Sequence, residues 1–207
     1  MKIIDKGYYY DVYDVDDTIV LKKRRRMFST MLFLCVTSFK RLQLPFKYIQ
    51  YFLSMTKDME INYSRIPKEA FYLLGNPVFI NALEYKQDKC VILKNSISTM
   101  SELEFKRWID EYLEVIRVTW SYGFSDLIFN FTVNTGRDKN GRLVQVDFNE
   151  ISFDKKLVVQ QVRQKYWLHN YSYKSLPPDF KKIWEISAEK FLTEEQVNVY
   201  WGNAQVV

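Results

Sequence analysis

The sequence predicts an α+β fold in which short antiparallel strands come first and helices follow. Three observations indicate this order. Four strand-like runs lie within the first hundred residues, a long helical stripe of apolar residues comes next, and an Asn-Gly turn then joins two strand-like runs. With 47% hydrophobic residues and few glycines and prolines, the 207-residue chain can form one globular domain or two small lobes.

The N-terminal part reads as strands around a helical insert. A mostly helical segment is expected from about residue 28 to 59. Four strands are expected, over Tyr8–Tyr13, Thr18–Arg24, Val78–Tyr85 and Cys90–Lys94. Gln87-Asp88-Lys89 would form the turn between the last two. We expect the four strands to form one antiparallel sheet.

The C-terminal part reads as mainly helical. Ser101-Glu102-Leu103-Glu104 is a capping box, and it opens a helix from about Glu102 to Trp120. Gly123 suits the end of that helix. Further helices are expected near residues 155–167 and 179–189. The predicted organisation is therefore an N-terminal lobe over residues 1–95 and a shortened helical lobe over residues 96–207.

A strand-like run that ends in Asp147-Phe148 is the most informative stretch of the chain. It follows the turn Asp138-Lys139-Asn140-Gly141, and Asn134 lies at the edge of strand-like residues upstream of that turn. An asparagine and an aspartate on paired strands can hold a divalent metal ion from two sides. Asn130 is the rival ligand if the first strand is longer than usual.

In this order of elements the chain resembles the protein-kinase-like superfamily, most closely its small bacterial members of the PhoP-regulatory-network type, over about residues 7 to 167. The resemblance implies a two-lobed kinase-like fold that binds ATP and Mg²⁺ in the cleft between the lobes. Asp147 would be the aspartate of the D-F-G motif, and Asn134 or Asn130 the metal-binding asparagine. Asp126 would orient or deprotonate the acceptor hydroxyl.

The same resemblance assigns two residues of the N-terminal lobe to the glycine-rich loop. Gly7 and Val12 fall on the second glycine and the valine of G-x-G-x-x-G-x-V. Asp5 and Tyr10 replace the first and third glycines, whose bare backbone would approach the phosphates.

Lys22 is the candidate for the nucleotide-binding lysine. It ends Ile19-Val20-Leu21-Lys22, which is similar to the V-A-I-K strand of kinases. Lys23 is the competing assignment, on the other face of the strand. The glutamate that would pair with the lysine stays open between Glu60 and Glu69.

Two alternatives to an ATP-dependent phosphotransferase follow from the same residues. The degenerate glycine loop, the irregular spacing from Asp126 to either asparagine, and the lack of an assignable glutamate partner for the lysine favour a pseudokinase, a regulatory or binding module with the same fold. A module that binds nucleic acid or an anionic membrane is the other alternative. It would use the basic segment 22–57, because no acidic residue but nine basic ones lie between Thr18 and Lys57, Arg24–Arg26 among them.

Several partners and sites are excluded or left open by composition. A single histidine excludes multi-histidine zinc sites. The two cysteines lie in apolar surroundings and read as buried thiols. With no signal-peptide layout and no apolar run long enough for a transmembrane segment, we expect a cytoplasmic protein. The phosphoacceptor or protein partner stays unknown.

Overall fold

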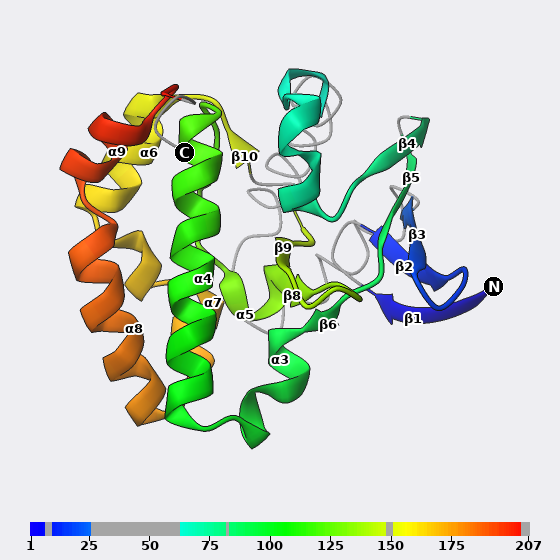
Figure 1. Cartoon of the computed structure of the whole chain (residues 1–207), viewed down its shortest axis with the longest axis horizontal. Helices are drawn as coiled ribbons and strands as arrows, with labels where there is room; N and C mark the ends of the chain where they lie inside the picture. Colours follow the sequence, from blue (N-terminus) through cyan, green and yellow to red (C-terminus); the bar gives the residue numbers. More distant parts are fainter. Residues whose placement is uncertain (7–9, 26–62, 82, 148–150, 204–207) are drawn as a thin grey trace, which may run out of the picture. The chain divides into compact units, whose positions relative to one another are not determined.

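The computed structural model describes residues 1–6, 10–25, 63–81, 83–147 and 151–203 (Figure 1). The chain divides into two compact units. The first comprises Met1–Arg65 and Asn76–Lys89, and the second comprises Ile66–Gly75 and Cys90–Val207. Gly7 and the helical segment expected at about 28–59 lie outside the described residues.

A five-stranded antiparallel sheet forms the first unit, with the order β1-β2-β3-β5-β4. Its strands are β1 (Lys2–Lys6), β2 (Tyr10–Asp14), β3 (Ile19–Arg24), β4 (Val78–Asn81) and β5 (Glu84–Asp88). Val20, Leu21 and Lys22 of β3 are all buried. Because consecutive side chains point to opposite faces, both faces of this central strand are covered. The predicted N-terminal antiparallel sheet is confirmed.

The expected strand from Val78 to Tyr85 is instead a hairpin of β4 and β5. The side-chain oxygen of Asn81 accepts a hydrogen bond from Leu83 N at 2.8 Å, which turns the chain inside an otherwise strand-like run. The expected turn at Gln87 is also wrong, because β5 continues to Asp88, which pairs with Ile19 of β3. Strand β1 had no counterpart in the prediction and forms an edge of the sheet.

The expected strand Cys90–Lys94 is wrong in its length and in its sheet. Only β6 (Val91–Ile92) is extended, and α3 (Leu93–Ser96) begins directly after it. β6 pairs with β8 (Thr135–Arg137) in the second unit. Just before β6, Lys89 N donates to Thr18 O at 2.7 Å, which ties the chain to the first unit.

Helix α4 (Glu102–Ser121) is the longest element of the second unit and confirms its prediction. Ser101 accepts from Glu104 N at 3.3 Å, and the Glu104 carboxylate accepts from Ser101 N at 2.8 Å, which is the reciprocal capping box. Gly123 follows the helix with a φ of 77°, a left-handed conformation that suits glycine. Among the helices of the described residues, none is both long and apolar enough to span a bilayer.

Other helices pack against the buried stripe of α4. Helices α8 (Pro178–Phe191) and α9 (Glu194–Tyr200) lie along it, and α6 (Lys155–Arg163) packs on α9 (Figure 1). Trp184 of α8 stands at the centre, with its ring centroid 4.6 Å from that of Phe131 and 5.9 Å from that of Trp167. This aromatic core confirms a largely helical C-terminal part, and the fold is α+β.

The Asn-Gly turn forms the predicted hairpin between β8 and β9 (Leu143–Gln145). Asp138 holds it, because its Oδ1 accepts from Asn140 N at 2.8 Å and from Arg142 N at 3.0 Å. Gly141 has a φ of 78°. Beyond the hairpin, β10 (Ile151–Ser152) returns to pair with β7 (Ser125–Asp126). In sequence the β8–β9 hairpin therefore lies between β7 and β10, two strands that pair with each other.

Candidate functional site

Asp126 occupies the end of β7, just after α4 and Gly123. Its backbone pairs with Ile151 of β10, so the residue is held in a two-stranded ladder. The side chain is 5% exposed, and its Oδ1 accepts a hydrogen bond from Ile128 N at 2.9 Å. A carboxylate buried to this extent is unusual unless it is paired or functional.

The chain between Asp126 and Asn134, which we call the Asp126 loop (residues 126–134), has an irregular backbone. Phe129 is fully buried and adopts a φ of 50°, a left-handed conformation that bulky residues rarely take. Asn130 follows at φ −86° and ψ 56°, and Phe131 N donates to Phe129 O at 3.0 Å, which describes an inverse γ-turn. The short helix α5 (Phe131–Asn134) then leads into β8.

Asp126 and Asp147 influence each other electrostatically. Burial raises the pKa of Asp126 to about 7, the backbone N–H of Ile128 opposes that rise, and the charge of Asp147 adds to it. Asp147 therefore lies near enough to repel a second negative charge on Asp126. Two carboxylates of this kind are a place where a cation would relieve repulsion.

The two rival asparagines have different surroundings. The Oδ1 of Asn130 accepts from Ser172 N at 3.0 Å and from Ser172 Oγ at 2.7 Å, so this oxygen is already engaged. Asn134 is buried, and its backbone oxygen accepts from Val146 N at 2.7 Å, which places it beside the residue before Asp147. Among the described residues, none hydrogen bonds to the Asn134 side-chain amide. The Asn130 side-chain oxygen is therefore the more engaged of the two.

This set fits a magnesium ion through its chemistry. Asp147 and Asn134 offer the hard oxygen atoms that Mg²⁺ prefers, and magnesium commonly keeps several waters and takes only one or two carboxylates from protein. Within the described ranges, no group of three or more His, Cys, Asp or Glu side chains is placed to hold a metal ion. A protein-only metal cage therefore has no support here, whereas a site completed by substrate oxygens is compatible with these residues.

Tyr112 is a neighbour of Asp126 that the sequence pattern placed only in the helix core. Its hydroxyl is buried and finds no hydrogen-bond partner in the described part of the chain. Burial raises its pKa well above the usual value, and the charge of Asp126 raises it further. No local signal distinguishes Tyr112 from the other members of the stripe, because its position next to Asp126 depends on tertiary packing.

In the first unit, Val12 and Lys22 are direct partners in the ladder between β2 and β3. Lys22 is buried, and its Nζ lies 5.6 Å from the ring centroid of Tyr85. Lys23 is half-exposed and forms an ion pair of 3.1 Å with Glu84. The two rival lysines therefore differ in exposure, because Lys22 is buried and Lys23 is half-exposed.

The glutamate partner of that lysine stays unassigned. Glu69 is exposed on η1 (Lys68–Leu74), which belongs to the second unit, and Glu60 lies outside the described residues. Cys90, expected to be a buried thiol, is of intermediate exposure. Cys35 lies outside the described residues.

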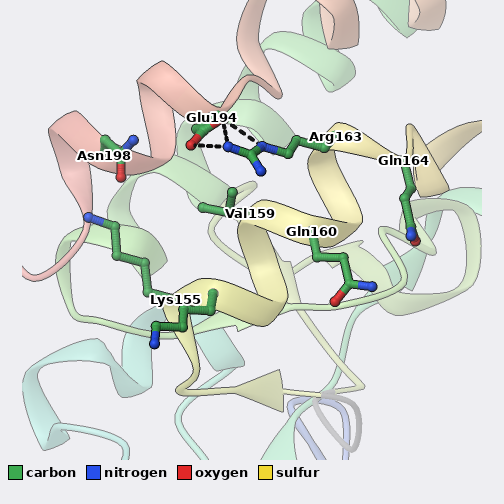
Figure 2. Close-up of a pocket in the computed structure, with 8 residues that line it drawn as sticks. Lys155, Val159, Gln160, Arg163, Gln164, Glu194 and Asn198 are labelled. Carbon is green, nitrogen blue, oxygen red and sulfur yellow. Dashed lines mark hydrogen bonds and ion pairs between the residues drawn. The ribbon is translucent and has the colours of Figure 1, made fainter.

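A surface pocket of about 550 Å³ lies apart from these residues, between α6 and α9 (Figure 2). The Arg163 guanidinium and the Glu194 carboxylate point toward each other across it and form two hydrogen bonds of 2.7 Å. The pocket is lined by Lys155, Lys156, Val159, Gln160, Arg163, Gln164, Glu194 and Asn198. The pocket is lined by side chains of both charges, and the guanidinium of Arg163 is already paired with Glu194.

A comparison with protein-family models finds no match to this chain, and a comparison with curated proteins finds none either.

Proposed function

We propose that this chain is a kinase-like protein that binds ATP with Mg²⁺ and uses Asp126 as the carboxylate for an acceptor hydroxyl. The observation that carries the proposal is the pair formed by the buried Asp126 and the half-buried Asp147 near Asn134, whose side-chain amide is not hydrogen-bonded by the described residues. The order of the elements around this pair supports it, since a long helix, an Asp-containing turn, an Asn-Gly hairpin and Asp147 follow one another. A cytoplasmic location, where both ATP and Mg²⁺ are available, belongs to the proposal.

In this proposal the Asp147 carboxylate and the Asn134 amide oxygen would hold the metal ion. When bound, Mg²⁺ supplies charge neutralisation to the β- and γ-phosphates of ATP. Lys22 is assigned to the phosphates by its sequence context, and its burial on β3 is compatible with a role other than surface solvation.

Asp126 has the chemistry for proton transfer. Its carboxylate would accept the proton of the acceptor hydroxyl while the hydroxyl oxygen forms a bond to the γ-phosphorus. The bond between that phosphorus and the bridging oxygen breaks, and ADP leaves with the electron pair. A pKa of about 7 is near the value at which a general base works best at neutral pH.

Nucleotide binding without transfer is the second candidate function. The observation that favours it is the Asp126 loop itself, because Asn130 is engaged by Ser172 and the next asparagine lies eight residues after Asp126. A pseudokinase could keep the metal ligands Asn134 and Asp147 and still lack turnover. Binding and transfer must therefore be measured separately.

The test compares the thermal unfolding of the wild type and of Asp147→Asn with ATP plus Mg²⁺, with ATP plus a chelator, and with Mg²⁺ alone. At 100 times its Kd, ATP with Mg²⁺ stabilises the wild type by about 2.7 kcal/mol, which raises the Tm by roughly 5–10 °C. Asp147→Asn should lose the magnesium-dependent part of this shift, because an amide replaces a charged ligand of nearly the same shape.

Asp110→Asn is the matched control, since Asp110 is an exposed carboxylate on α4 that pairs only with Lys106 at the surface. It should keep the full shift. An equal magnesium-dependent shift in Asp147→Asn would show that the metal site is elsewhere. Release of ADP by the wild type and not by Asp126→Asn would then separate a phosphotransferase from a pseudokinase.

A further inference from the structure

Asn170 links a second helix to the Asp126 loop. It caps α7 (Tyr171–Ser175), where its Oδ1 accepts from Tyr173 N at 2.8 Å. Its Nδ2 points the other way and donates to Ile128 O at 2.7 Å and to Phe129 O at 2.9 Å. The side chain is buried, and all its hydrogen-bonding groups are used.

Ser172 makes the next set of contacts along the same loop. It is completely buried, and both its N and its Oγ donate to Asn130 Oδ1, at 3.0 Å and 2.7 Å. Its Oγ also receives a bond from Thr132 N at 2.8 Å and lies 2.8 Å from Thr132 Oγ1. One hydroxyl thus joins two residues of the loop, and every partner is about forty residues away in sequence.

These hydrogen bonds are made to the part of the backbone that has the strained conformation. A non-glycine residue in the left-handed region costs about 1–2 kcal/mol, so Phe129 needs tertiary contacts to stay there. Asn170 binds the carbonyl of Phe129 itself and that of the residue before it. Ser172 fixes the residue after it. The strained conformation is therefore held from both sides by one short helix.

The held segment lies between the two groups that the proposed mechanism needs. Asp126 precedes it and Asn134 ends it, at the point where Asn134 N donates to Asn130 O at 3.0 Å. If Phe129 returned to an ordinary conformation, the chain direction between Asp126 and Asn134 would change. Asn134 would then no longer be kept beside Val146 and Asp147.

We infer that Asn170 and Ser172 are positioning residues, which hold the Asp126 loop so that Asp126 and Asn134 face Asp147 together. The consequence for magnesium and nucleotide rests on the proposed function, while the restraint of the loop does not. Neither residue would touch the substrate. Partners that orient metal ligands in this way typically contribute 10–100-fold to metal affinity.

The experiment uses the full chain and the variants Asn170→Asp and Ser172→Ala. Asn170→Asp keeps the oxygen that caps α7 but replaces both donors with a carboxylate oxygen, which repels the two carbonyl groups. Ser172→Ala adds no charge and removes the hydroxyl from Asn130 and Thr132. Controls are Thr193→Ala, which removes the cap of α9, and Ser175→Ala on α7, whose hydroxyl bonds only to Ser172 O.

The first measurement is calorimetric affinity for ATP with Mg²⁺ and for ATP with a chelator. Both loop variants should weaken the magnesium-dependent affinity by 10–100-fold and leave the magnesium-free affinity unchanged, whereas both controls should match the wild type. Equal losses in the controls, or no loss in the loop variants, would overturn the inference.

The second measurement needs no nucleotide. If the wild type binds no nucleotide, only the proposed function is rejected, and this measurement still tests the restraint of the loop. Amide hydrogen exchange is followed at Asn134, whose hydrogen bond goes to Asn130 O and involves neither mutated side chain, and at Phe131, whose acceptor Phe129 O also accepts from Asn170 Nδ2. Exchange at both amides should rise at least tenfold in the loop variants and stay at the wild-type rate in the controls. Unchanged exchange in Asn170→Asp and Ser172→Ala would show that the loop does not depend on these residues.

Discussion

The Asp126→Asn substitution should make the protein more stable at alkaline pH. Burial raises the pKa of Asp126 from its ordinary value of 3.8 to about 7 in the folded protein. Between these two values the folded state holds a proton that the unfolded state has released, so the free energy of unfolding falls as pH rises. Above about pH 7 the folded protein carries a buried charge, and the full cost is present.

The size of this cost follows from the two pKa values. Their difference corresponds to about 4 kcal/mol of unfolding free energy at pH 8. Asparagine is neutral at every pH and can still accept from Ile128 N, but its NH₂ group replaces an oxygen that faces other backbone N–H groups, a loss of about 1–2 kcal/mol. The variant should therefore be about 2 kcal/mol more stable than the wild type at pH 8. Near pH 4 it should be about 1–2 kcal/mol less stable.

Urea unfolding of both proteins, without metal or nucleotide, at pH 4 and pH 8 tests this reversal. Asp110→Asn serves as a control, because an exposed carboxylate should give the same small change at both pH values. A variant that is less stable than the wild type at pH 8 would show that the ionised carboxylate stabilises the fold. Asp126 would then be a structural acid, and its proposed role in proton transfer would lose its electrostatic support.

Three further predictions concern the scaffold and the basic segment. Gly136→Ala should destabilise the protein by about 1–3 kcal/mol, because the new Cβ would lie 2.9 Å from the Cβ of Cys90 in the neighbouring chain segment. An unchanged midpoint of urea unfolding would contradict this close approach. Ser101→Ala removes one half of the capping box and should cost about 1 kcal/mol, or about 2–4 °C in Tm by calorimetry, so a Tm equal to that of the wild type would mean that α4 does not depend on its cap. If the chain binds polyanions, replacing the arginines at 24, 25 and 26 with glutamine should weaken binding to a short oligonucleotide and reduce its salt dependence. In the structure Arg25 lies 3.0 Å from the Asp11 carboxylate. Oligonucleotide affinity that changes neither with these substitutions nor with salt would show that the segment is an ordinary solvated face.

The elements that local rules specify were the ones that the sequence predicted well. Helix α4 has a capping box, a continuous apolar stripe and a terminal glycine, and it runs from Glu102 to Ser121 as expected. The Asn-Gly hairpin is equally local, because Asp138 and Gly141 carry its turn. By contrast, the turn at Asn81 interrupts an apolar run whose alternation predicts one strand, and a single side-chain hydrogen bond decides the outcome.

Sheet membership and the surroundings of the two candidate metal ligands depend on contacts that are distant in sequence. Val91 has the character of a strand residue, but only the position of β8 determines which sheet it joins. In the same way, spacing alone leaves Asn130 and Asn134 as rivals. Ser172 donates hydrogen bonds to the side chain of Asn130, whereas none is formed with that of Asn134 in the described residues. Nothing near either asparagine in sequence indicates this partner.

The stretch around Asp147 is attached at both ends to the region that carries Asp126. On its near side Val146 N bonds to Asn134 O, and on its far side Ile151 pairs with Asp126. Separation of either attachment would loosen Asp147 from Asp126, so we expect the two carboxylates to separate in one step of local unfolding. A denaturant that opens the short ladder of β7 and β10 should therefore separate Asp126 from Asp147 while α4 and α8 remain packed.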